Sequence, residues 1–165
     1  MTELSILEMT AEVSVAFAGF IGVFLILATR EGRFGAEDSL AIQALVIGSV
    51  ASVFYSAAPL ILYAFGVSGA ELWRISSGLI GLVGVAVVAY VVPQVRALAP
   101  TEGIRSVNLS NLVGLTLSAL GLLCLLANVL AWPWAPSGGM YLLAVWLVVA
   151  IAGTNFVVLI FRKVL

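Results

Sequence analysis

The chain has 165 residues, of which 63% are hydrophobic and 9% are charged, and its mean hydropathy is +1.23. An ordinary soluble domain carries about 25% charged residues, so this composition excludes a soluble globular domain, a disordered chain and a nucleic-acid-binding protein. With no His, a single Cys and a net charge of −1, the chain lacks the commonest metal ligand, cannot form an intrachain disulfide and shows no sign of a polyanionic partner.

Five apolar runs are long enough to cross a hydrocarbon layer about 30 Å thick, which takes about 20 residues per helix. They cover residues 9–29, 39–65, 72–92, 108–131 and 139–161. The first run ends at a charged loop that starts with Arg30, the second ends at Gly66, and Pro93 is predicted to stop the third. The fourth ends at the segment 132–136 and the fifth at Arg162. None alternates like a barrel strand, so helices are the predicted spanning structure.

The fold prediction is therefore an all-α, polytopic membrane protein in which residues 1–165 form a single five-helix transmembrane bundle. Basic residues near span ends stay in the cytoplasm, and one side of the predicted bundle collects Arg30, Arg33, Arg96, Arg105, Arg162 and Lys163. The other side has Arg74 alone. We expect the N-terminus outside and the C-terminus in the cytoplasm, in a bacterial inner (plasma) membrane. Four aromatic residues at the predicted outer ends agree, since such rings settle at interfaces: Trp73, Trp132, Trp134 and Tyr141.

Small residues recur at helical spacing on three of the predicted helices. Helices in lipid associate where small side chains let their backbones approach, and residues four apart share a helix face. Packing faces are predicted for Ser14, Ala18 and Gly22, for Ala44, Gly48, Ser52 and Ser56, and for Gly78, Gly81 and Gly84. Each face either holds the bundle together, or forms a subunit interface or a narrow pore. Pro59, inside the second helix, predicts a kink or a strong tilt.

Ionisable groups inside a membrane are costly, so each marks a candidate site. Glu12 lies just inside the predicted outer end of the first helix, and Glu8 lies one turn further out on the same face, which Glu3 is expected to extend. Arg74 has a similar depth in the third helix and is close in sequence to Glu71. Two interpretations stay open. Either Arg74 pairs with Glu12 or Glu8 and pins two helices together, or the carboxylates form an acidic outer vestibule that attracts cations.

Neutral polar residues lie deeper in the predicted helices. Gln43 and Asn155 have comparable depths in the second and fifth helices, and Asn128 lies in the fourth. We expect these side chains to form hydrogen bonds between helices, worth about 0.6–2 kcal/mol each. A catalytic Ser–His or Cys–His couple is impossible without His, and Glu8 with Glu12 alone makes a weak acid–base site. No enzymatic activity, metal or cofactor is expected.

Two functions from different classes fit this composition. The preferred one is a small oligomeric channel or ion-conducting protein with an acidic outer mouth around Glu8 and Glu12. The alternative is a non-catalytic membrane subunit that scaffolds a larger membrane complex or binds lipid. The expected partners are membrane lipids, further copies of the chain and other membrane subunits. The two functions differ in whether the Glu12 face lines a water-filled cavity.

Overall fold

A computed structural model describes residues 3–30, 39–98 and 104–164 of the chain. The structure is all-helical over these residues, and its five helices are long and apolar enough to span a membrane. The helices are α1 (Glu3–Arg30), α2 (Ser39–Ala64), α3 (Gly69–Leu98), α4 (Ile104–Leu130) and α5 (Gly138–Val164). Over these residues, the all-α class and the five helices of membrane-spanning length predicted from the apolar runs are confirmed.

Helix bounds differ from the prediction by four residues or more at three ends. Helix α1 begins six residues earlier than residue 9, at Glu3, and α4 begins four residues earlier than residue 108. The prediction that Pro93 stops the third helix is wrong, since α3 continues to Leu98. Pro93 is exposed, and a proline removes only its own N–H from the helix ladder, which an exposed position near a helix end tolerates.

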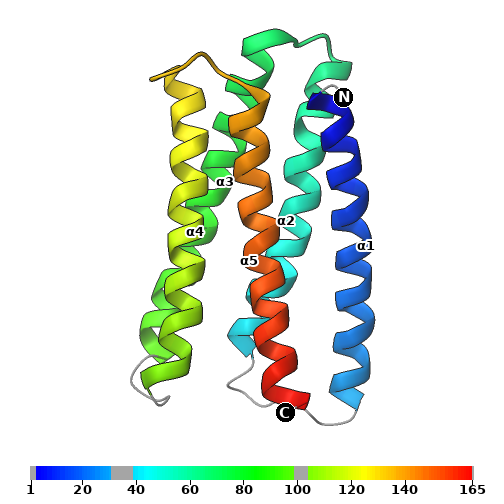
Figure 1. Ribbon diagram of the computed structural model, residues 1–165, viewed down its shortest axis with the longest axis vertical. Helices are drawn as coiled ribbons and strands as arrows, with labels where there is room; N and C mark the ends of the chain where they lie inside the picture. The colour runs from blue at the N-terminus through cyan, green and yellow to red at the C-terminus, as the bar shows by residue number, and fades with distance from the viewer. Residues whose placement is uncertain (1–2, 31–38, 99–103, 165) are drawn as a thin grey trace.

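The helices run alternately up and down, so the two ends of the chain lie at opposite ends of the bundle (Figure 1). Helices α2 and α5 pack together in the middle, α1 lies mainly against α2, and α3 and α4 form the opposite side. We call the end that holds the start of α1 and the α2–α3 and α4–α5 connections the N-terminal end.

Close approaches between helices occur at several of the predicted small residues. A Cβ built on Gly48 of α2 would lie 3.2 Å from the Ala152 Cβ of α5, so this pair fixes the distance between the two central helices. Further along the same face of α2, Ser52 and Ser56 are buried, and each donates a hydrogen bond to a carbonyl of its own helix. Ala44 has a side chain outside the described part of the structure.

The glycine row of α3 faces α4. A Cβ on Gly84 would lie 3.1 Å from the Leu122 Cδ2, and Cβ atoms on Gly78 and Gly81 would lie 3.8 Å and 4.0 Å from side-chain atoms of α4. The stretch of α4 that these glycines meet runs from Leu122 to Val129, in the opposite direction to α3. The absence of side chains on this row lets the two helices approach.

The predicted packing face of α1 is only partly used within the chain. Ser14 is buried and Ala18 is half-buried, but a Cβ on Gly22 would meet no atom within 4 Å. Below this level the interface is built from rings instead, because Phe17, Phe20 and Phe24 each pack edge-on against Phe156 of α5, with centroid distances of 5.4–5.9 Å. Large rings hold the backbones apart there, so Gly22 is not at a close approach.

Aromatic residues at the N-terminal end fall into two groups. Trp132 and Trp134 are 71% and 69% exposed, as expected for rings at a membrane interface. Trp73 and Tyr141 are different from the prediction, since both are buried and their rings pack together with centroids 5.7 Å apart. They belong to the main hydrophobic core, which also contains Leu7 of α1.

Candidate functional site

Glu8 and Glu12 lie on the face of α1 that points away from the other helices. The opposite face of α1 is buried at Leu7, Thr10 and Ser14, whereas both carboxylate-bearing side chains are exposed. Residues four apart share a helix face, so the pair forms one outward-facing acidic surface, which we call the acidic face. Glu3 does not extend it, because the Glu3 carboxylate lies over Gly138 at the start of α5, on the inner side of α1.

Glu12 lies deep along the helix. Helix α1 has 28 residues, which at 1.5 Å per residue is about 42 Å long, and Glu12 is about 7 Å from its midpoint. When the helix is centred in a hydrocarbon layer about 30 Å thick, this carboxylate lies well inside that layer.

Arg74 is directed toward α4 and not toward α1. Its Nε donates a hydrogen bond of 2.9 Å to the Val129 carbonyl oxygen, one of the last carbonyls of α4, which have no donor within their own helix. A cation at a helix C-terminus also interacts favourably with the helix dipole. Helices α2 and α5 lie between α1 and α3. Among the residues that the structure describes, Arg74 forms no ion pair with Glu8 or Glu12, so the pairing within one chain that the sequence left open is not made.

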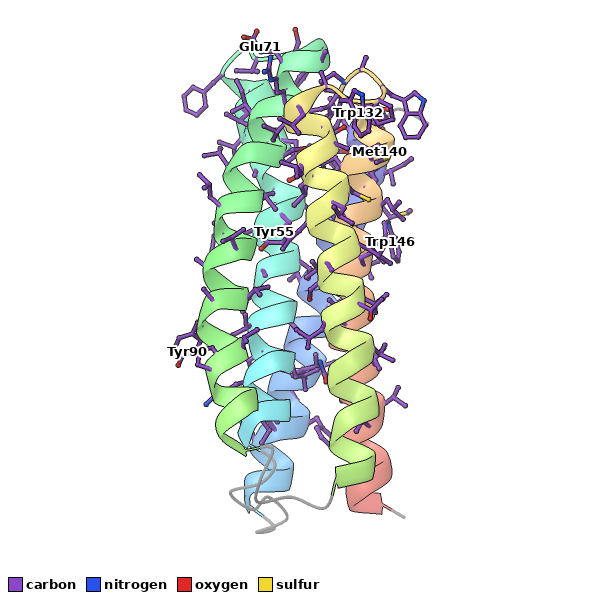
Figure 2. All side chains as sticks on the ribbon, turned by 90° about the vertical axis from the view of Figure 1, so that its left-hand side faces the viewer. Tyr55, Glu71, Tyr90, Trp132, Met140 and Trp146 are labelled. Carbon is purple, nitrogen blue, oxygen red and sulfur yellow. The ribbon has the colours of Figure 1, made fainter. Side chains whose placement is uncertain are left out.

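Glu71 lies in the first turn of α3 and is exposed. It is at the tip of the N-terminal end, close to the level of Trp132 (Figure 2). A carboxylate in the first turn of a helix is stabilised by the positive end of the helix dipole. Glu71 therefore lies at the tip of the bundle, whereas Glu12 lies within the apolar length of α1.

Asn128 is the centre of a polar cluster that joins α3, α4 and the start of α5. Its Nδ2 donates to the Ser77 Oγ of α3 at 3.1 Å and to the Ser137 carbonyl oxygen at 3.0 Å, and its Oδ1 accepts from the Ser137 N–H at 3.1 Å. Asn128 is 2% exposed. Ser137 in turn caps α5, since its Oγ accepts a hydrogen bond from the Met140 N–H.

The other two predicted interhelical amides do not link helices. Asn155 donates its side-chain N–H to the Ile151 carbonyl oxygen of its own helix at 3.0 Å, and Gln43 is exposed. An amide four residues after a carbonyl on the same helix can reach it locally, and this local bond replaces the expected bond to α2. The prediction that Asn155 bonds across helices is therefore wrong.

Tyr141 supplies an interhelical hydrogen bond that the sequence reasoning missed. Its hydroxyl donates to the backbone carbonyl oxygen of Tyr55 at 2.6 Å, linking α5 to α2. That carbonyl is four residues before Pro59, which has no N–H to donate to it. Pro59 therefore leaves one carbonyl of α2 unbonded inside its own helix, and Tyr141 satisfies it. Pro59 in the sequence predicts that the carbonyl four residues earlier lacks its helical donor. It does not predict which residue supplies a donor instead.

Two buried hydroxyl groups, those of Ser14 and Ser76, have no hydrogen-bond partner. Within residues 3–30, 39–98 and 104–164, no group of three or more acidic, His or Cys side chains is placed to hold a metal ion. No protein-family model, curated protein or solved structure matches this chain.

Proposed function

We propose that this chain forms an oligomeric, cation-conducting membrane protein in which the acidic face of α1 lines a path shared by several copies. The observation that carries the proposal is the position of Glu12, which is exposed on the outside of the bundle and within its apolar length. Ionisable side chains at such depth almost always face protein or a water-filled cavity. Within a single chain, Glu12 faces neither protein nor a water-filled cavity. A further copy of the chain is the simplest source of both a protein contact and a cavity.

The path is placed between copies because side chains fill the bundle interior. The core around Tyr141 and Trp73 joins α1, α2, α3, α4 and α5 at the N-terminal end, and a second cluster around Ile21 and Leu45 fills the space between α1, α2 and α5 in the other half. Between these levels Gly48 and Ala152 hold α2 and α5 in close contact. Water and ions would have to pass outside this packed interior, along an external face such as that of α1.

Glu12 gives this path its selectivity in the proposed function. A carboxylate within the apolar length of α1, repeated in every copy, creates a negative potential that concentrates cations at the mouth of the path. The basic residues that predict the orientation would place this mouth outside the cell, in the plasma membrane. Except for Arg74, those basic side chains lie outside the described residues.

Cation flux into liposomes tests the proposal. Glu12→Gln keeps the shape of the side chain and removes its charge, so we expect assembly to survive and cation flux to fall about tenfold or more. Glu71→Gln is the matched control, since it removes an exposed carboxylate at the water-facing end and should change flux little. Absence of wild-type flux under every cation gradient and applied voltage would overturn the conducting function. The remaining proposal would then be a membrane subunit that scaffolds a complex or binds lipid.

A further inference from the structure

We propose that neighbouring copies of this chain contact each other head to tail, with Glu8 of one copy forming an ion pair with Arg74 of the next. The inference rests on the proposed oligomer and identifies the contact that builds it. Three features of the described residues carry it, namely unpaired charges, their location on opposite sides of the bundle, and their similar height along it.

Both partners have unused hydrogen-bonding capacity within the chain. Arg74 uses its Nε on the Val129 carbonyl, and a guanidinium has five N–H donors, so four remain. Glu8 is exposed and forms no ion pair with any described residue. Charged groups on the membrane-facing surface of a helix are costly unless they are paired or hydrated, and pairing between copies would satisfy both.

The two charges lie on opposite sides of the bundle. Helix α1 is at one side, and α3 with α4 is at the other (Figure 1). Figure 2 looks onto the side formed by α3 and α4, with α1 on the far side. A surface and its complement on opposite sides of one molecule produce a heterologous contact. Repeated from copy to copy with a rotation about the membrane normal, such a contact closes into a ring.

The heights of the two groups are similar. Glu3, Trp73 and Gly138 meet at one level, because a Cβ on Gly138 would lie 2.5 Å from the Glu3 Cδ and 2.7 Å from the Trp73 Cζ2. Glu8 lies five residues past Glu3, about 7.5 Å further along α1. Arg74 lies one residue past Trp73, about 1.5 Å further along α3, and its side chain reaches across to the Val129 carbonyl of α4. Copies that span one membrane in the same orientation therefore present the two residues about 6 Å apart in depth, a difference that two long side chains can bridge.

This contact gives the two carboxylates different roles. Glu8 is neutralised by the arginine of the neighbouring copy and determines assembly. Glu12, one turn deeper on α1, has no such partner and remains the charged group of the path.

Cysteine cross-linking tests the contact in liposomes that contain the full chain. Cys124, the single native cysteine, is first replaced by Ser. We expect Glu8→Cys or Arg74→Cys alone to give no cross-linked dimer under mild oxidation. A mixture of the two single variants should give dimers that contain one of each, and a chain carrying both changes should give a ladder of higher oligomers. Ile61→Cys combined with Arg74→Cys is the matched control, since Ile61 is exposed near the same end of α2 and should not cross-link.

Three results would overturn the contact. The first is dimers from Glu8→Cys alone, which would show that acidic faces meet each other. The others are cross-linking of the Ile61 control to the same extent and no cross-linking of the mixture. Charge reversal provides a second measurement in case a cysteine variant misfolds. Arg74→Glu should lower the association constant about tenfold or more, and adding Glu8→Arg should restore it. Cross-linking without cation flux would retain the contact and reject conduction. Cation flux without cross-linking would retain conduction and reject the contact.

Discussion

The hydrogen bond from Tyr141 to the Tyr55 carbonyl predicts a measurable dependence on Pro59. Tyr141→Phe removes only the hydroxyl, which donates at 2.6 Å from a side chain that is 0% exposed, so water cannot replace it. Leaving a buried carbonyl unbonded costs about 1–3 kcal/mol, and interhelical hydrogen bonds in membranes contribute about 0.6 kcal/mol on average. We therefore expect the free energy of unfolding to fall by about 2 kcal/mol.

A double-mutant cycle identifies the cause. Pro59→Ala restores an N–H that can donate to the Tyr55 carbonyl within α2, so Tyr141→Phe should cost about 1–2 kcal/mol less in that background. The assay is unfolding of the purified protein by increasing SDS in mixed micelles, followed by circular dichroism. Tyr63→Phe is the control, since Tyr63 is 53% exposed and its hydroxyl should contribute little. Equal costs of Tyr141→Phe in the two backgrounds would refute the link to the proline.

Two further predictions concern the packing of the bundle. Asn128→Leu should lower the free energy of unfolding by about 1–3 kcal/mol in the same assay, because the partly buried Ser137 N–H loses its acceptor. Asn155→Leu, which removes a bond within one helix, should cost under about 1 kcal/mol, and similar losses for the two variants would contradict the role of the cluster. Gly48→Leu should destabilise the bundle by about 2 kcal/mol or more, since its Cβ would already be 3.2 Å from α5. Gly19→Leu, at a position with no atom within 4 Å of a built Cβ, should leave the melting temperature nearly unchanged, and equal melting temperatures of the two variants would contradict the close approach.

The number of helices was predictable because the thickness of a bilayer dictates the length of each apolar run. The ends of the helices were less predictable from the sequence. Glu3 and Glu8 look like residues that precede a span, yet α1 includes both, and Glu3 packs over Gly138 of a helix distant in sequence. Pro93 looks like a stop signal and is accommodated in α3. Such outcomes depend on tertiary neighbours, which local sequence does not specify.

The candidate site, too, was predictable from the sequence only in part. Spacing alone places Glu8 and Glu12 on one face, since four residues make about one helical turn. Which direction that face points depends on the order in which the helices pack, and the structure turns it outward with α2 and α5 between it and Arg74. Asn128 could be predicted as a polar link from its depth, but its bonds to Ser137 depend on how the α4–α5 connection folds back.

The proline in α2 also has a consequence for biosynthesis. A ribosome delivers α2 to the membrane before α5, so for a period the Tyr55 carbonyl is unbonded and the donor that satisfies it has not yet been made. An unsatisfied carbonyl in hydrocarbon costs several kcal/mol, so early in synthesis α2 retains a polar site that water, lipid headgroups or the insertion machinery must cover. Arrival of Tyr141 removes that site, so the hydrogen bonding of α2 is complete only once α5 has packed against it.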